Sequence, residues 1–304
     1  MRTLSGVLVT LALAGACASS RTSDTPTPPT GSTSGNEGVD ASAQTLTNAP
    51  DASAAAEVPA APRMGPITIT AGERRAVPSP TPRVAIRAPA NNSTTRESRV
   101  EVRLAVQNWR NVADANDMRH IHLVLDNEPY RRIDDPTRPV VLENLSEGTH
   151  VLRAFPGWET HETVKEAGAF AVTVFHVGRA SADLGFNPRA PLLTYSRPKG
   201  EVTGPGANRI LLDFFLTNIA PNELGESGFR VRPTIDGNTL PDLTAWVPYY
   251  ITNLPDGEHT IGLQLIGRDG NPAPGPFNRA ENRITVSREA PAPQPTPANP
   301  HAGH

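Results

Sequence analysis

The chain has 304 residues, with 32 prolines, 24 glycines and only 5% aromatic residues, a composition too rich in loop-forming residues for one large core. Two domains of roughly 100 residues with extended tails fit this composition better. The net charge is -3 and the sequence contains no run of lysine or arginine, which argues against nucleic acid and anionic membrane surfaces as partners.

Residues 1–16 predict an export signal. Arg2 is followed by an apolar run, Leu4–Leu13, and then by a small-residue site, Ala14–Ala16. The apolar run is too short to span a bilayer as a stable anchor. Cys17, the only cysteine, stands directly after this site, so the folded part of the mature chain has no cysteine for a disulfide.

Residues 13–17, Leu-Ala-Gly-Ala-Cys, resemble the lipobox of bacterial lipoproteins, although leucine lies one place further from Cys17 than is usual. The resemblance implies cleavage before Cys17 and its acylation, and thus a protein anchored in the cell envelope through this lipid. The following residues, Ala18 and Ser19, include no aspartate, which by the same resemblance favours the outer membrane over the inner one. The alternative is an ordinary secretory signal with an unmodified cysteine.

Composition divides the rest of the chain into folded and unfolded parts. Residues 17–63 and 289–304 are rich in small polar residues and proline, so we expect a disordered tether and a disordered tail. Between them we expect two folded domains, 64–178 and 190–288, joined by a linker at 179–189. The tether indicates that the folded part stands off the membrane.

The two predicted domains share motifs in the same order. Residues 144–150 and 253–259 both have the pattern Asn-Leu-x-x-Gly-x-His. Upstream, an asparagine and an aspartate lie 18 residues apart in each copy, as Asn108 and Asp126 and as Asn218 and Asp236. A repeat of about one small domain indicates two copies of one fold.

Short segments of alternating apolar and polar residues recur in each copy between Gly, Pro, Asn and Asp, and none has a helical period. About seven short strands per 100 residues predict an all-β fold of two tandem antiparallel immunoglobulin-like β-sandwiches. The expected strands are Arg83–Ala88, Val100–Val106, His120–Leu125, Pro139–Leu142, Thr149–Phe155 and Phe170–Val177, then Ile210–Leu216, Phe229–Ile235, Val247–Ile251, His259–Ile266 and Arg283–Val286.

The repeated Gly-x-His, Gly148 with His150 and Gly257 with His259, resembles the corner before strand F of immunoglobulin-like and fibronectin-type domains. A tyrosine often occupies the histidine position in those domains. The resemblance implies a structural role, in which each imidazole bonds to the backbone at the corner. The alternative is a catalytic histidine in each copy.

The first copy also resembles a bacterial envelope domain family of unknown function. The similarity consists of His-x-His-Leu-x-Leu-Asp at residues 120–126 and Gly-x-His-x-Leu at residues 148–152. It implies the fold and the compartment, and it implies no activity.

Common catalytic motifs are absent from the sequence, which has no Gly-x-Ser-x-Gly, no phosphate-binding glycine loop and no His-Glu-x-x-His. The carboxylates are scattered over turns, and Asp134 with Asp135 indicates a solvated turn more than a calcium site. We therefore expect a protein that is not an enzyme.

His120 and His122 share one face of a predicted strand, so their rings project in the same direction. The loop after the neighbouring strand carries His161, which predicts that three imidazoles meet at one end of the first copy. Neutral imidazoles suit zinc or copper. Because the second copy has Arg230 and Arg232 at the positions of the strand histidines, we expect this face to be exposed to solvent. Ordinary surface histidines are the alternative.

Trp109, Trp158 and Glu159 are predicted at the same end, where loops on a rigid scaffold form a candidate recognition surface together with Phe155. The alternative is that the aromatic residues cap the core. The sequence thus predicts a non-catalytic, lipid-anchored envelope protein whose two modules bind or display an envelope protein or a polysaccharide. No cofactor is expected in this interpretation; a zinc- or copper-binding role is its alternative.

Overall fold

Short strands separated by turns make up both copies in the computed structural model, which describes residues 65–181 and 184–289. Within these ranges, no helix is long and apolar enough to cross a membrane. The export signal, Cys17 and the tether lie outside the described residues, as does the tail beyond residue 289.

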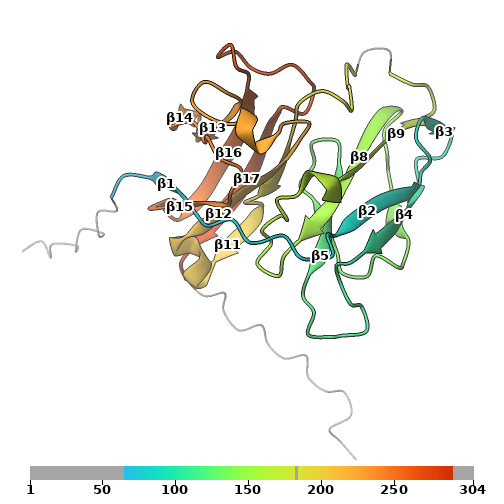
Figure 1. Cartoon of the computed structure of the whole chain (residues 1–304), viewed down its shortest axis with the longest axis horizontal. Helices are drawn as coiled ribbons and strands as arrows, with labels where there is room; N and C mark the ends of the chain where they lie inside the picture. The colour runs from blue at the N-terminus through green and yellow to red at the C-terminus, as the bar shows by residue number, and fades with distance from the viewer. Residues whose placement is uncertain (1–64, 182–183, 290–304) are drawn as a thin grey trace, which may run out of the picture. The chain divides into compact units, whose positions relative to one another are not determined.

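The first sandwich consists of two sheets, in the strand orders β2-β4-β7 and β3-β9-β8-β5-β6 (Figure 1). Neighbouring strands are antiparallel, except that β3 runs parallel to β9. Val102 of one sheet and Leu123, Leu152 and Phe175 of the other belong to the shared core. The strands are β2 (Arg83–Ala88), β3 (Ser93–Thr95), β4 (Val100–Gln107), β5 (His120–Leu125), β6 (Arg131–Ile133), β7 (Val140–Leu142), β8 (Gly148–Gly157) and β9 (Ala171–Val177).

The second sandwich repeats this order, with sheets β15-β12-β10 and β11-β17-β16-β13-β14 and with β11 parallel to β17. Its strands are β10 (Leu192–Arg197), β11 (Gly200–Thr203), β12 (Ile210–Thr217), β13 (Arg230–Ile235), β14 (Asn238–Thr239), β15 (Tyr249–Thr252), β16 (Gly257–Ile266) and β17 (Arg279–Ser287). Both orders are those of an immunoglobulin-like sandwich. The predicted fold class is confirmed. Short 3₁₀ turns lie at η1 (Ala167–Ala169), η2 (Gly204–Asn208) and η3 (Pro221–Glu223).

One strand crosses the predicted domain boundary. Strand β1 (Thr68–Ala71) pairs antiparallel with β15 of the second sandwich (Figure 1), and the Thr68 and Thr252 hydroxyls lie 2.7 Å apart. The prediction that residues 64–178 all belong to the first domain is therefore wrong at its beginning. The physical reason is that β15 would otherwise be a bare sheet edge, whose open backbone groups β1 satisfies.

The residues that repeat between the copies have positive φ angles. Their values are 57° at Asn108, 59° at Asn218, 48° at Asp126, 50° at Asp236, 57° at Asn144 and 60° at Asn253. Asparagine and aspartate tolerate this left-handed region better than most other residues with a side chain. The repeated asparagine and aspartate residues thus occupy three left-handed turn positions that occur in both sandwiches.

The two sandwiches pack against each other through the outer faces of the β5–β8 pair and of the β10–β12 pair. The ring of Phe155 on β8 lies 4.9 Å from that of Phe215 on β12, centroid to centroid. Beside them, Lys165 and Asp213 form an ion pair between the sandwiches, and both side chains are buried. The apolar contact explains why the second sandwich covers this face of the first.

The prediction that the histidine face of β5 is exposed is therefore wrong, since His120 and His122 are both 0% exposed. The corresponding side chains of the second copy, Arg230 and Arg232, are partly exposed and pair with Asp242. The same sheet face is thus buried in the first copy and solvated in the second. The residues of the second copy were therefore no guide to the burial of the corresponding residues in the first.

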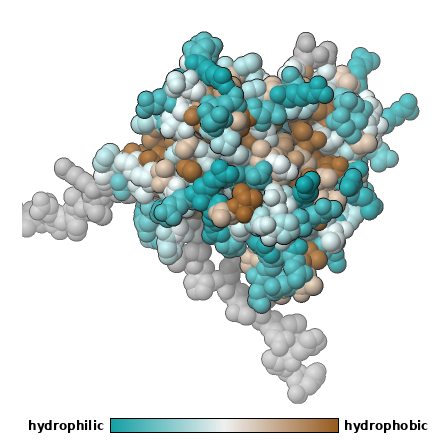
Figure 2. Space-filling model, viewed as in Figure 1, coloured by the Kyte–Doolittle hydropathy of each residue, from teal (hydrophilic) through white to brown (hydrophobic). Residues whose placement is uncertain are grey.

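Hydrophilic side chains are spread widely over the surface in Figure 2. Among the described residues, the large hydrophobic side chains that are exposed are Val112, at 44%, and Met118, at 50%. Both lie on the loop between β4 and β5, which leads directly into the two histidines.

Candidate metal centre

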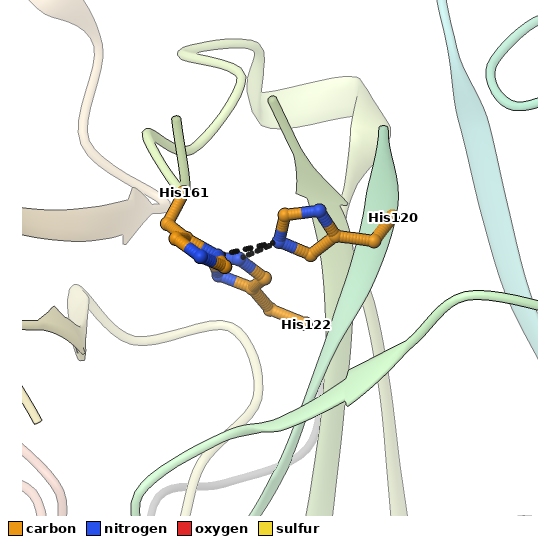
Figure 3. A group of neighbouring side chains, drawn as sticks. All are labelled: His120, His122 and His161. Carbon is orange, nitrogen blue, oxygen red and sulfur yellow. Dashed lines mark hydrogen bonds between the residues drawn. The ribbon is translucent and has the colours of Figure 1, made fainter. Parts of the chain in front are cut away.

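Three imidazole rings converge beside the contact between the sandwiches (Figure 3). His120 and His122 project from β5, and His161 projects from the turn after β8. The Nε2 atom of His120 lies 2.9 Å from Nε2 of His122 and 3.1 Å from Nδ1 of His161. One nitrogen from each ring lies within 4.8 Å of the other two. The structure therefore brings together the three residues that the sequence singled out.

A tight turn places His161. Gly157 and Thr163 form an isolated antiparallel bridge, the Trp158 amide donates to the Glu162 carbonyl, and the His161 amide donates to the Trp158 carbonyl. His161 has φ 67°, in the left-handed region. That conformation costs about 1–2 kcal/mol for a residue with a Cβ. Strain of this kind is concentrated at functional sites, and here it directs the ring towards the other two.

Gly157 leaves the space that the rings occupy. It pairs with His120 across β5 and β8. A Cβ added at Gly157 would lie 2.4 Å from Nε2 of His122 and 3.1 Å from Nε2 of His120. A side chain there would collide with the converging nitrogens. Sequence analysis did not single out this glycine. Its position at the end of β8, directly before the turn that carries His161, could have indicated that space is needed there.

Hydrogen bonds on the far side of two rings fix their orientation. His120 Nδ1 lies 3.0 Å from the Met118 carbonyl, which can only accept, so Nδ1 carries the hydrogen and Nε2 of the neutral ring has a free lone pair. His122 Nδ1 lies 3.0 Å from Oγ of Ser196 on β10. When Nδ1 donates to that hydroxyl, His122 also turns a bare Nε2 inward. A cation among the inward nitrogens then satisfies both lone pairs.

Burial keeps the three rings neutral. It lowers the pKa of His120 to about 4 and the pKa of His161 to about 3, and it holds the pKa of His122 well below its ordinary value. Neutral imidazole is the form that binds a metal ion, so the ligand atoms are available at neutral pH without competition from protons.

A fourth polar group, which sequence analysis missed, lies against the histidines. The hydroxyl of Tyr130, just before β6, is 3.2 Å from Nδ1 of His161. Its ring stacks on His122 with centroids 3.7 Å apart, and only 1% of the residue is exposed. Burial raises the pKa of this phenol to about 12. The feature of the sequence that comes nearest to indicating Tyr130 is its position four residues after Asp126, which directly follows β5.

The predicted recognition residues have different surroundings. Trp109 is buried, its indole N–H donates to the His120 carbonyl, and Trp158 packs edge-on against it at 4.8 Å. Phe155 is also buried, so neither Trp109 nor Phe155 is a surface anchor, and both agree with the alternative that the aromatic residues belong to the core. Trp158 is half-buried, and Glu159 is exposed and pairs with Arg75 at 2.7 Å.

The two corner histidines have matching contacts. In the first copy, His150 Nδ1 lies 2.8 Å from the Asp126 carboxylate and Nε2 lies 3.0 Å from the Ser146 carbonyl. In the second copy, the corresponding distances from His259 are 2.7 Å to Asp236 and 3.0 Å to the Pro255 carbonyl. The backbone contact expected at this corner is present in both copies. Gly148 and Gly257 stand two residues earlier with φ of 137° and 129°, a region that other residues rarely adopt.

Both partners of the His150 ring are acceptors, so an imidazolium, in which both ring nitrogens donate, satisfies them. Burial acts to lower the pKa of His150, but the bonds to the Ser146 carbonyl and the Asp126 carboxylate outweigh it and the pKa is raised. This geometry ties down the chain before β8 and leaves no free nitrogen for catalysis.

The sequence matches no family model and no curated protein. Solved structures with some similarity include the fibronectin(III)-like modules of Clostridium thermocellum CbhA, at 12% identity over 67% of this chain and 95% of that one, with a TM-score of 0.25. Another is the central fibronectin-III array of RIM-binding protein, at 13% identity over 69% of this chain and 70% of that one, with a TM-score of 0.22. The immunoglobulin-like assignment rests on the strand order and register given above.

Proposed function

We propose that the protein binds a transition-metal ion, zinc or copper(II), at His120, His122 and His161. The observation that carries the proposal is the convergence of one nitrogen from each ring within 4.8 Å. The protein in this proposal is exported and lipid-anchored through Cys17, as the sequence pattern of residues 1–17 suggests.

The spacing of the nitrogens supports a shared cation. Zinc–imidazole bonds of about 2.0–2.1 Å in a tetrahedral site put neighbouring nitrogens roughly 3.3 Å apart. Two of the three pairs, at 2.9 and 3.1 Å, are slightly closer than this, and the third lies within 4.8 Å, so the rings have to adjust around a bound ion. Imidazole is a ligand that both zinc and copper(II) accept.

The surroundings favour holding the metal over catalysis with it. His120 and His122 are fully buried and His161 is partly exposed, so protein surrounds most of the site. Structural metal sites are closed in this way, whereas catalytic sites keep a position open for substrate. Imidazoles also suit an exported protein, because they do not oxidise to disulfides as cysteine thiolates do.

The test is metal uptake by the mature chain. Dialysis against zinc or copper(II), followed by elemental analysis, should give one tightly held ion per chain, and His120→Ala/His122→Ala should lose it. His301→Ala/His304→Ala is the matched control, because it removes two histidines from the tail and should keep the ion. No uptake, or uptake that the His120→Ala/His122→Ala variant retains, would overturn the proposal.

A second candidate is the binding or display role that the sequence predicts, with an envelope protein or a polysaccharide as partner. Its test uses the exposed side chains of Val112 and Met118, which lie on the loop that precedes the histidines. Retention of the protein on peptidoglycan or another envelope polysaccharide, reduced in Met118→Ser, would support it. A protein that passes through such columns unretarded would exclude the polysaccharide partner.

A further inference from the structure

Three histidines leave one vertex of a tetrahedral centre for another ligand, and the structure places a phenol beside it. The Tyr130 hydroxyl lies 3.2 Å from Nδ1 of His161, close to the spacing expected between two ligands of one tetrahedral ion. His161 Nδ1 in turn lies 3.1 Å from Nε2 of His120. The phenol oxygen is thus adjacent to the set of inward nitrogens.

The tyrosine is already held in place. Its ring is parallel to that of His122 within 10°, with centroids 3.7 Å apart, and the residue is buried. A ligand that is fixed by stacking loses little conformational freedom when it binds an ion.

The positive charges near the tyrosine favour an anionic ligand for the metal ion. The Arg197 guanidinium lies 5.4 Å from the Tyr130 ring and the Lys199 amine 4.3 Å from it, both from the second sandwich. A dication bound by three neutral imidazoles next to these two cations is repelled by them in a buried site of low dielectric. A phenolate supplies the missing negative charge, and the same two cations stabilise it.

We therefore propose that Tyr130 binds the metal ion as a phenolate and is the fourth ligand of a closed three-histidine, one-tyrosine centre. This inference rests on the proposed function, because it requires that the three histidines bind a metal ion. The phenolic proton leaves to solvent when the oxygen binds the ion. The second sandwich contributes to this centre through Arg197 and Lys199 and does not supply a ligand.

Copper(II) is the probe for this ligand, because a phenolate bound to copper(II) gives a charge-transfer band in the visible range that imidazole does not give. The mature protein loaded with one copper(II) should show the band. Tyr130→Phe keeps the ring that stacks on His122, so it should still bind copper(II) through the histidines and should lose the band. Tyr195→Phe is the matched control, because its buried hydroxyl has no hydrogen-bond partner among the described residues and the band should persist.

The outcomes separate this inference from the proposed function. Copper(II) bound by the wild type without the band, or a band that persists in Tyr130→Phe, would overturn the tyrosine ligand and leave the histidine site standing. Failure of the wild type to bind copper(II) or zinc would overturn both. If Tyr130→Phe does not fold, resonance Raman spectroscopy of the wild-type copper protein decides the question, because excitation in the band enhances tyrosinate vibrations only when the phenolate is bound.

Discussion

The Nδ1 atom of His122 in the first sandwich lies 3.0 Å from the Oγ atom of Ser196 in the second. His122 has its other nitrogen among the converging imidazoles, 2.9 Å from that of His120. A residue of the second sandwich therefore orients the His122 ring, whose Nε2 atom lies among the converging nitrogens of the first sandwich. Docking of the two sandwiches and the shape of the candidate centre are consequently linked.

Ser196→Ala should weaken metal binding. The hydroxyl can accept the hydrogen of His122 Nδ1, which leaves Nε2 free to bind the ion. Partners of this kind commonly account for about 10–100-fold in metal affinity. Competition with a chelator of known affinity measures the change for zinc. Ser181→Ala is the control, because its hydroxyl accepts from the Thr149 amide away from the centre. Equal affinities for Ser196→Ala and the wild type would mean that Ser196 does not orient the ligand.

Gly157→Ala should block the centre while leaving the sandwich folded. The added Cβ would lie 2.4 Å from Nε2 of His122, closer than such contacts occur, so the ring must move out of position. We expect loss of metal uptake, measured by elemental analysis after dialysis. Gly206→Ala adds the same methyl group where nothing lies within 4 Å, and its uptake should match that of the wild type. A Gly157→Ala protein that binds metal normally would contradict this geometry.

Periodicity and turn residues predicted the elements of each sandwich because those features are local. Strand β5 runs over His120–Leu125 as expected, and strand parity put His120 and His122 on one face. The neighbouring positions of two strands in an immunoglobulin-like sheet then brought His161 to the same end. These steps need only the order of strands within one domain.

The burial of that face and the contacts of the centre with Ser196 and Lys199 depend on how the sandwiches dock, which local patterns do not encode. Ser196 and Lys199 are distant from β5 in the sequence and belong to the other sandwich. The pairing of β1 with β15 likewise joins Thr68 to Thr252. Such long-range contacts leave no periodic pattern in the sequence. The comparison of the two copies also led to the wrong prediction of an exposed histidine face, because Arg230 and Arg232 face solvent and the histidines do not.

Lys165 and Asp213 should contribute strongly to the docking of the sandwiches, and each should be costly to replace alone. The lysine amine contacts the Asp213 carboxylate and also donates to the Thr163 hydroxyl at 2.7 Å and to the Phe214 carbonyl at 3.1 Å. Removing one member leaves the other charge buried without its partner, which costs about 3–5 kcal/mol. Urea denaturation of Lys165→Met and of Asp213→Leu measures the free energy of unfolding.

The double variant Lys165→Met/Asp213→Leu is the matched control for that prediction. It removes both buried charges, so its loss of stability should be clearly smaller than the sum of the two single losses. The Lys165 amine is buried, and this burial lowers its pKa. Strictly additive losses would mean that the two side chains do not interact.

The corner of the first sandwich should make stability depend on pH through His150. The pKa of His150 is raised in the folded protein, because the bonds to the Ser146 carbonyl and the Asp126 carboxylate outweigh burial. The stabilisation is thus complete below the unfolded value of about 6.5 and is lost as the pH rises through the raised folded value. His150→Phe, which loses both bonds, should cost about 1.5–3 kcal/mol near pH 6 and less near pH 9 in urea denaturation. Asp126→Asn is the control: its amide no longer requires the imidazolium, so its stability should vary less over this range. A His150→Phe penalty that is constant between the two pH values would show that the ring is not charged in the folded protein.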